Sequence, residues 1–396
     1  MRTSSIVRGA ASTALGMLLV GIASVPAHAE GMRARQWQLD AYGAEEIWQF
    51  SKGEGVTVAV IDSGVDKDNP DLRGQVLRGK DFATDKPGDE TTDYSGHGTN
   101  MAGLIAGTGQ RDGGNGAFGL APAAKILPVR VPGAADGAES IRGVPEAIRF
   151  AADSGAKVID ISVAVATDSP QLTEAVKYAL DKGALVFAGV GDDAEKGNKP
   201  MYPAATPGVV GVGAADDKTR HIPMSQYGPQ VDLIAPGKDT VAACGPGICK
   251  SSGTGNAAAL VSAAATLLWS KHSDWTNNQV LKVMLNTVAK PSGGEERSDY
   301  IGYGAVRPLR TLKTPGDPGP AGVRPIDDLA ENIQAAPSVS ASATPAPQAA
   351  ATEDGGDTAL WIGLGVGAAV LIGAAVSIPV LRSRRGRVPP PAIGRP

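Results

Sequence analysis

The sequence predicts an α/β fold in which helices cover both faces of a mostly parallel β-sheet. Short apolar segments alternate with amphipathic ones from about residue 53 to about residue 288, as in sheets whose parallel strands are joined by crossover helices. The apolar segments are continuous runs, which is typical of strands that are buried on both faces. Residues 257–269 are apolar on nearly every side, so we expect a helix through the middle of the core.

The individual elements follow from these runs. We expect five strands, at residues 56–61, 125–131, 157–162, 184–189 and 209–214. Residues 140–153 and 169–181 show helical periodicity. The second of these helices opens with Ser169 and Pro170, an N-cap residue followed by proline at the first helical position. Ligands of such sheets bind at the carboxyl ends of the strands, so we expect the functional site there.

Composition limits the classes of function. The chain has 396 residues, 42% of them hydrophobic, and a net charge of −4. This is enough for one large domain with appendages. Because basic residues are not in excess, we expect no nucleic-acid partner. We also expect no cofactor and no metal, since the acidic group Asp66, Asp68 and Asp71 is interpreted as a capped turn in preference to a calcium site.

The N-terminus has the pattern of a secretory signal peptide at residues 1–29. Arg2 and Arg8 precede an apolar run, and Ala27-His28-Ala29 resembles a signal-peptidase site, so we expect cleavage after Ala29. The alternatives are an uncleaved membrane anchor and a core helix.

The C-terminal part has the pattern of a tether followed by a membrane anchor. Residues 315–357 are rich in Pro, Ala, Ser and Thr, a composition that cannot bury a core. Residues 358–381 carry no charged side chain and exceed the ~20 residues that a membrane-spanning helix needs. Arginines in residues 382–396 place that tail in the cytoplasm. We therefore expect a single-pass protein of the cell membrane whose globular domain, residues 30–314, is extracytoplasmic; the alternative for the apolar segment is a buried core helix.

The chain has two cysteines, Cys244 and Cys249. An exported chain lies in an oxidising compartment, so a disulfide between them is favoured over two free thiols. Two cysteines without a histidine close by cannot fill a zinc site.

Three short motifs carry the chemistry. Asp62 directly follows the first strand, His97 stands between glycines ahead of a small-residue helix, and a Gly-Thr pair precedes Gly255 at the start of the apolar helix. Each residue alone is more often structural than catalytic. In the order acid, histidine, nucleophile position, the motifs resemble the catalytic residues of the subtilisin-like serine proteases. The resemblance implies a subtilisin-like fold in which Asp62 orients His97 and His97 acts as general base.

A narrower resemblance comes from the order of the segments. A signal peptide, residues 36–41 (Gln-Trp-Gln-Leu-Asp-Ala) ahead of the domain, a proline-rich tether and a C-terminal membrane helix resemble the mycosins. These are membrane-anchored proteases of type VII secretion systems in actinobacteria. The resemblance covers most of the mature chain and implies the membrane complex of such a secretion system as a partner.

The chain departs from this family at the nucleophile. Gly255 stands where the family has the attacking serine, so His97 has no hydroxyl to deprotonate. Ser251 and Ser252 are out of register because the Gly-Thr pair fixes the frame, and Ser262 is expected to be buried two turns into the helix. In subtilisin, loss of the serine costs about a millionfold in turnover.

Two further departures concern the oxyanion and the substrate cleft. The family has an asparagine that donates a hydrogen bond to the oxyanion, and here Asp192 replaces it. An ionised carboxylate cannot donate, and in subtilisin loss of the donor costs about a hundred- to a thousandfold. Ser162-Val163-Ala164-Val165 stands where the family usually has Ser-Leu-Gly-Gly, so Ala164 and Val165 are expected to crowd the cleft.

The hypothesis that joins these observations is a membrane-anchored subtilisin-fold pseudoprotease with a binding or scaffolding role in type VII secretion. One alternative is an active serine endopeptidase that processes secreted proteins with another nucleophile. The other is a non-catalytic module that binds a peptide or protein ligand in the cleft.

Overall fold

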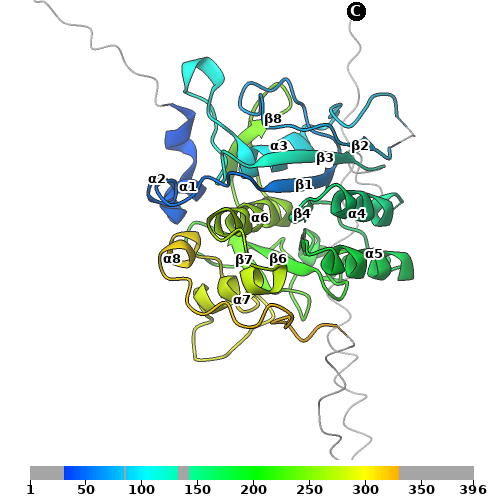
Figure 1. Ribbon diagram of the computed structural model, residues 1–396, viewed down its shortest axis with the longest axis vertical. Coiled ribbons are helices and arrows are strands. Elements are labelled where there is room, and N and C mark those ends of the chain that lie inside the picture. The colour runs from blue at the N-terminus through cyan, green and yellow to red at the C-terminus, as the bar shows by residue number, and fades with distance from the viewer. Residues whose placement is uncertain (1–30, 84–85, 133–141, 330–396) are drawn as a thin grey trace, which may run out of the picture. The chain divides into compact units, whose positions relative to one another are not determined.

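A computed structural model describes residues 31–83, 86–132 and 142–329 (Figure 1). All of them belong to the first of two compact units, Met1–Ala336. The predicted signal peptide and membrane segment, and most of the predicted tether, lie outside the described residues. Within the described ranges, no helix is long and apolar enough to cross a membrane.

The central sheet of the described chain is parallel throughout. Its strands are β1 (Thr57–Asp62), β2 (Lys80–Asp81), β3 (Lys125–Arg130), β4 (Val158–Ile161), β5 (Leu185–Gly189), β6 (Val210–Ala215), β7 (Leu233–Pro236) and β10 (Gly304–Ala305). They lie in the order β10-β7-β6-β5-β4-β1-β3-β2, and each neighbouring pair is parallel. The five predicted strands are confirmed as β1, β3, β4, β5 and β6. A separate antiparallel hairpin consists of β8 (Thr240–Cys244) and β9 (Gly247–Ser251).

The helices are α1 (Trp37–Tyr42), α2 (Ala44–Ile47), α3 (His97–Ala106), α4 (Val144–Asp153), α5 (Pro170–Asp181), α6 (Thr254–Lys271), α7 (Asn277–Thr287) and α8 (Pro308–Lys313), with short 3-10 turns η1 (Met32–Arg35), η2 (Arg111–Gly113) and η3 (Ala194–Lys196). α5 begins as predicted, because Ser169 Oγ accepts a hydrogen bond of 3.2 Å from the N–H of Leu172 and Pro170 is the first helical residue. The predicted core helix is confirmed as α6, which is longer at both ends.

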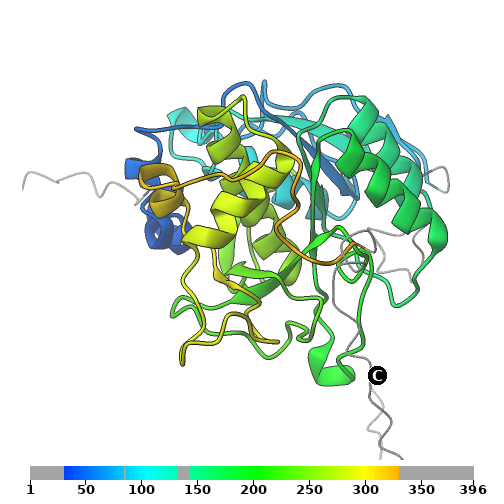
Figure 2. The same ribbon diagram turned by 60° about the horizontal axis from the view of Figure 1, so that its bottom comes forward.

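The sheet separates two hydrophobic cores. In β1, Val58 and Val60 lie in the core that also contains residues of α3 and α6, whereas Ala59 and Ile61 lie in the core formed with α4 and α5. Figure 2 shows α4 and α5 side by side on their face of the sheet. Both faces of β1 are therefore apolar, which explains why the strand sequences are continuous apolar runs.

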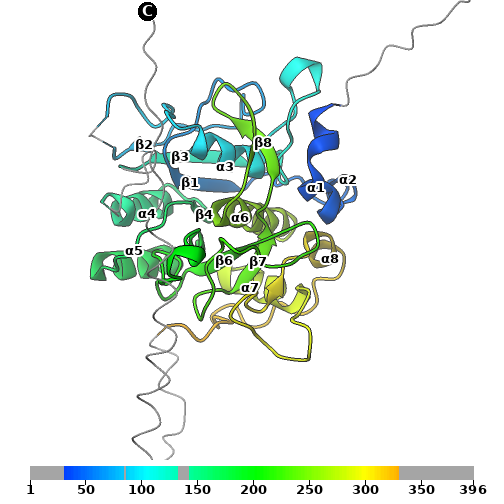
Figure 3. The ribbon, with the colours of Figure 1, turned by 180° about the vertical axis from the view of Figure 1, so that it is seen from behind.

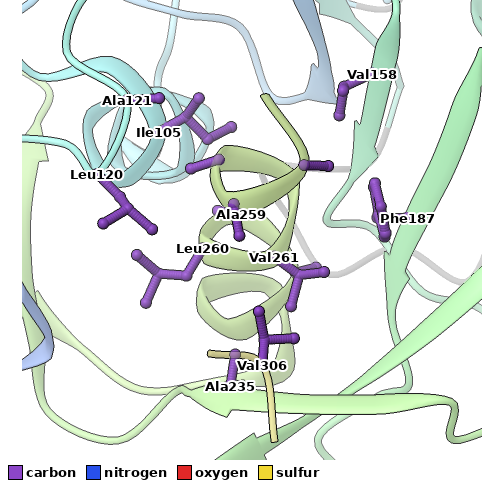
Figure 4. Close-up of a cluster of buried hydrophobic side chains, with 14 of the residues drawn as sticks. Ile105, Leu120, Ala121, Val158, Phe187, Ala235, Ala259, Leu260, Val261 and Val306 are labelled. Carbon is purple, nitrogen blue, oxygen red and sulfur yellow. The ribbon is translucent and has the colours of Figure 1, made fainter. Parts of the chain in front are cut away.

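α6 runs through the middle of the first core. Every residue from Thr254 to Trp269 is buried. Ala259, Leu260 and Val261 lie among side chains of α3, β4, β5 and β7 (Figure 4). A helix that is apolar all round is expected to be enclosed in this way. This enclosure fixes the first turn of α6, and with it Gly255, at the carboxyl edge of the sheet.

Residues 32–47, the segment before the domain's first strand, pack on the side of the domain. The side-chain amides of Gln36 and Gln38 are buried and donate hydrogen bonds to the carbonyl oxygen of Val241, at 2.9 Å and 2.7 Å. Leu39 and Ile47 are buried in the first core. α1 contacts β8, and α2 contacts α8, so this segment is an integral wall of the domain.

A disulfide closes the β8–β9 hairpin. Cys244 and Cys249 are bonded, with their Cα atoms 5.7 Å apart, which confirms the predicted pairing. The tip of the hairpin contacts the loop before α3, because a Cβ on Gly96 would lie 3.3 Å from the nitrogen of Gly245. The hairpin therefore supports the backbone from which His97 projects.

Replacing both cysteines by serine should lower the free energy of unfolding by about 2 kcal/mol, because the disulfide closes a short loop in the unfolded chain. Chemical denaturation of the oxidised protein and of the double variant measures the difference. When dithiothreitol reduces the disulfide, the two proteins should have the same denaturation midpoint. A variant as stable as the oxidised protein would contradict this expectation.

The first residues of the predicted tether pack on the domain. Arg324 is 8% exposed, donates a hydrogen bond of 3.0 Å to the carbonyl oxygen of Gly208, and forms an ion pair of 2.7 Å with Asp328. Ile326 is 5% exposed and belongs to the first core. The contact is made by this ion pair, by hydrogen bonds such as the one from Arg324 to Gly208, and by Ile326, and a proline-rich sequence indicates none of them.

Candidate functional site

Asp62 and His97 meet at the carboxyl end of β1. Asp62 is the last residue of the strand and its side chain is fully buried, whereas the His97 side chain is 42% exposed. Both carboxylate oxygens of Asp62 lie 2.9 Å from Nδ1 of His97. The attraction of Asp62 is the largest cause that raises the pKa of His97 to about 9. An aspartate in this position orients the imidazole and favours its charged form.

Asp93 holds the loop from which His97 projects. One of its carboxylate oxygens accepts hydrogen bonds from the hydroxyl of Ser63 at 2.8 Å and the N–H of Gly96 at 2.9 Å. The other accepts from the N–H of Thr99 at 2.9 Å, inside the first turn of α3. Sequence reasoning missed this role of Asp93, although an acid four residues before His97 was an available signal.

Gly255 lies in the first turn of α6, beside the end of β4. A Cβ on this glycine would lie 3.2 Å from Cβ of Ser162 and 3.5 Å from the sulfur of Met101. β5 approaches so closely that a Cβ on Gly189 would lie 2.8 Å from the nitrogen of Gly255. The sheet edge thus has room at position 255 for a small side chain only after Ser162 shifts by a few tenths of an ångström.

Asp192 follows β5, and its carboxylate lies at the start of α6. One oxygen accepts a hydrogen bond of 2.8 Å from the N–H of Thr254. The other would be 2.9 Å from a Cβ on Gly253, the N-cap residue, which has no side chain to cap the helix. A helix N-terminus favours a negative group. Burial is the largest cause that raises the pKa of Asp192.

Comparison with known proteins decides the family. Residues 53–304 match the subtilase family of peptidases, and this segment includes Asp62, His97, Asp192 and Gly255. The chain belongs to the subtilase family.

Curated subtilases align over the same region. A thermophilic serine proteinase of Bacillus sp. (strain AK1) is 35% identical over 261 residues, which are 65% of this chain and 62% of that protein. Thermitase of Thermoactinomyces vulgaris is 35% identical over 263 residues, or 66% of this chain and 90% of thermitase.

Two solved structures of MycP proteins are similar to this chain. The crystal structure of MycP1 from Mycobacterium smegmatis has a TM-score of 0.63 and 27% identity, covering 73% of this chain and 87% of that chain. The structure of the MycP3 protease of the type VII (ESX-3) secretion system has a TM-score of 0.59 and 31% identity, covering 70% and 87%. The chain is therefore similar in fold to mycosins.

The serines near this subtilase site all have partners. Ser251 donates a hydrogen bond of 2.8 Å to the side chain of Asn100. Ser252 accepts one of 2.8 Å from the N–H of Asp239. Ser262 is fully buried, as predicted, and donates to Asp160 at 2.8 Å. These hydroxyls are bonded to groups other than His97, whose ring has Asp62 as its side-chain hydrogen-bond partner among the described residues.

Residues 162–165, which were expected to crowd the subtilase cleft, differ from one another in their exposure to solvent. Val165 is buried and its backbone exchanges two hydrogen bonds with Tyr202, of 2.9 Å and 2.7 Å. Val163 is half-buried against the second core, and Ala164 is exposed. Ala164 is thus accessible to solvent, whereas Val165 packs within the domain.

Asp160 is a buried acid below the site that the sequence analysis did not single out. It lies in β4, and its two oxygens accept hydrogen bonds from Ser262 at 2.8 Å and Ser162 at 3.1 Å. Burial raises the pKa of Asp160 to about 7. An acid in the middle of an apolar strand was the available signal, because such a group needs hydrogen-bond donors inside the core.

The acidic group after β1 forms turns. Asp66 accepts a hydrogen bond of 2.9 Å from the N–H of Asp68. Asp71 is fully buried and pairs with Arg111 at 3.2 Å. Among the residues that the structure describes, no group of three or more His, Cys, Asp or Glu side chains could hold a metal ion.

Nuclear magnetic resonance of the imidazole should show His97 titrating with a pKa of about 9 in the full chain. Asp62→Asn should move this pKa downward, because the carboxylate is its largest cause. The folded state holds the proton more tightly than the unfolded state, so this contribution to stability is complete below pH ~6.5 and is lost as the pH rises through about 9. A His97 pKa at or below 6.5 would contradict the assignment.

Proposed function

We propose that this protein is a membrane-anchored subtilase homologue without peptidase activity, which serves type VII secretion by binding or scaffolding. The observation that carries the proposal is Gly255 at the start of α6, where the family motif has its serine. Acyl transfer by this site needs an oxygen or sulfur nucleophile, and glycine supplies neither.

The position of Asp192 supports the same conclusion. Its carboxylate already accepts a hydrogen bond from the N–H of Thr254, in the first turn of α6. A developing oxyanion near this helix end would be repelled by an ionised carboxylate. Asp192 thus binds the N-terminus of α6, and an ionised carboxylate there would oppose the charge that forms during catalysis.

The hydrogen bonds that the site retains support a binding or scaffolding role that needs the folded domain. Asp62, His97 and the Asp93 loop keep their hydrogen bonds, and the segment before the domain packs into the first core. The similarity to MycP1 and MycP3, whose structures come from type VII secretion systems, supports the choice of that process. The proposed arrangement has the domain outside the cell membrane and the predicted helix 358–381 across it.

Complementation in the native cell tests this function. The gene is deleted and replaced by the unmodified gene or by one that encodes Asp62→Ala together with His97→Ala. We expect both to restore secretion of type VII substrates equally, because a binding role does not use the general base. The unmodified chain should also co-purify with the secretion membrane complex after mild crosslinking.

Each result bears on a separate part of the proposal. If secretion fails with the double variant although it accumulates normally, the role is catalytic and the proposed inactivity is contradicted. If deletion leaves secretion unchanged and nothing of the complex co-purifies, the link to type VII secretion is contradicted.

Ser162 is the one specific argument for an active enzyme. Its hydroxyl would lie 3.3 Å from a Cβ on Gly255, so an oxygen is close to the nucleophile position. That hydroxyl donates to Asp160, an acid whose pKa is raised to about 7 by burial. Loss of a measured hydrolytic activity in Ser162→Ala, with Ser252→Ala as the control, would establish this alternative.

A further inference from the structure

A pocket lies over the carboxyl ends of β6 and β7, apart from the residues of the subtilase site. It has a volume of about 610 Å³ and is enclosed by α1 on one side and α8 on the other. Figure 3 shows α1 and α8 on the same side of the domain. The carboxyl ends of parallel strands are where ligands of such sheets bind. One wall exists only because the segment before the domain packs into place.

The body of the pocket is apolar. Ile234, Ala235 and Pro236 of β7 line it from the sheet, and Trp37 of α1 and Val306 line it from the sides. A cavity of this size and lining suits a small organic molecule, whose apolar surface gains roughly 25 cal/mol for each Å² removed from water.

Tyr42 supplies an unused hydrogen-bond donor in the same wall. Tyr42 is one of the residues that line the pocket, it is 8% exposed, and its hydroxyl is buried without a hydrogen-bond partner among the described groups. Burial raises the pKa of Tyr42, so the hydroxyl stays protonated at physiological pH. A buried donor without an acceptor is unfavourable, and an acceptor atom of a ligand would relieve that cost.

Two arginines at the start of α8 place positive charge at the rim. Arg307 is the N-cap residue of α8 and Arg310 lies in its first turn, and both line the pocket. Neither forms an ion pair within the part of the chain that the structure describes, and both are exposed. A rim of this kind favours an anion with oxygens that a guanidinium can bind.

The other charged groups around the pocket are mostly neutralised. Lys313 of α8 forms an ion pair with Glu46 of α2. Asp216 is bonded to Arg220 at 2.6 Å. Asp217 is exposed and is the one negative charge that opposes the two arginines. The excess at the pocket is therefore positive.

We propose that this pocket binds a small organic carboxylate. The apolar body of the molecule fills the space between Trp37 and β7, its carboxylate accepts the hydroxyl hydrogen bond of Tyr42, and Arg307 and Arg310 hold the charge. This proposal stands apart from the fate of the peptidase site, because it uses none of the same residues.

Three probes test the proposal: 4-phenylbutyrate, 4-phenylbutyramide and 4-phenylbutylamine. They share a phenyl ring on a four-carbon chain and differ in the head group. Isothermal titration uses the purified full chain in a nonionic detergent, with a detergent blank for each probe. We expect the carboxylate to bind at least tenfold more tightly than the amide, and the amine to bind most weakly. Equal affinities for acid and amide, or no binding of the acid up to several millimolar, would overturn the proposal.

Variants assign the binding to this pocket. Tyr42→Phe should weaken binding of 4-phenylbutyrate about tenfold and leave the melting temperature equal or higher, because it removes a buried donor that has no partner. Arg307→Gln with Arg310→Gln should weaken binding by at least as much and reduce its dependence on salt. Arg149→Gln, a partly exposed arginine on α4, is the matched control and should bind as the unmodified chain does. Unchanged binding in both the tyrosine and the double arginine variant would place the ligand elsewhere.

Discussion

Gly255→Ser combined with Asp192→Asn should turn the full chain into a measurable hydrolase. We expect its rate on an activated ester, p-nitrophenyl acetate, to exceed that of the unmodified chain by at least ~1000-fold, since in subtilisin the serine and the amide donor contribute about a millionfold and a hundred- to a thousandfold. Serine gives His97 a hydroxyl to deprotonate. Asparagine can keep the hydrogen bond from the N–H of Thr254 and offer its amide where the second oxygen of Asp192 now lies.

The matched control is Gly255→Ala combined with Asp192→Asn. It adds the same Cβ, 3.2 Å from Ser162, and therefore carries the same steric cost without the hydroxyl. The rate of Gly255→Ser alone should be about a hundredfold or more below that of the double variant, because Asp192 supplies no amide donor for the oxyanion. An alanine control as active as the serine variant, or a folded double variant without activity, would contradict this interpretation of the two positions.

The stability of the unmodified domain should fall as the pH rises from about 4 to about 7, and Asp160→Asn should remove part of that fall. Burial raises the pKa of Asp160 from 3.8 to about 7, so in this window the folded state binds a proton that the unfolded state has released. For each such group, the free energy of unfolding falls by up to about 4 kcal/mol as the pH rises through the window. Asp232, whose pKa burial also raises to about 7, acts in the same direction.

Thermal unfolding of both proteins at pH 5 and pH 8 measures the effect. At pH 5 the unmodified chain, with Asp160 protonated, should be close in stability to Asp160→Asn. At pH 8 the asparagine variant should be the more stable of the two, because it has no charge to bury and can still bond Ser162 and Ser262. Asp153→Asn, at an exposed carboxyl on α4, is the control and should show no such pH-dependent gain. A difference that is the same at both pH values would contradict the raised pKa of Asp160.

The strands and the positions of the triad could be predicted because their signals are local. β1 is a continuous apolar run that ends in an acid, and α6 is apolar all round after a Gly-Thr pair. The roles of Asp62, His97 and Gly255 are what the resemblance of their order to the subtilisin-like motifs implies, and they stay predictions. Parallel strands bring their carboxyl ends to one edge, so these predictions needed no contact distances.

Other features depend on contacts between distant segments. Gln36 reaches Val241 across more than two hundred residues of sequence, and Asp160 finds Ser262 only because α6 crosses β4. The edge strand β10 spans just Gly304 and Ala305, too short for any periodicity. The pocket between α1 and α8 likewise has no sequence signal, since its two walls are far apart in the chain.

Reaction with a fluorophosphonate probe tests the central claim most directly, because the probe forms a covalent adduct only with an activated serine nucleophile. Intact mass spectrometry compares the unmodified full chain with Gly255→Ser combined with Asp192→Asn. We predict no mass increase for the unmodified chain and a single adduct on residue 255 of the double variant. A single adduct on the unmodified chain, at Ser162 or at any other serine, would contradict the claim that this subtilase has lost its nucleophile.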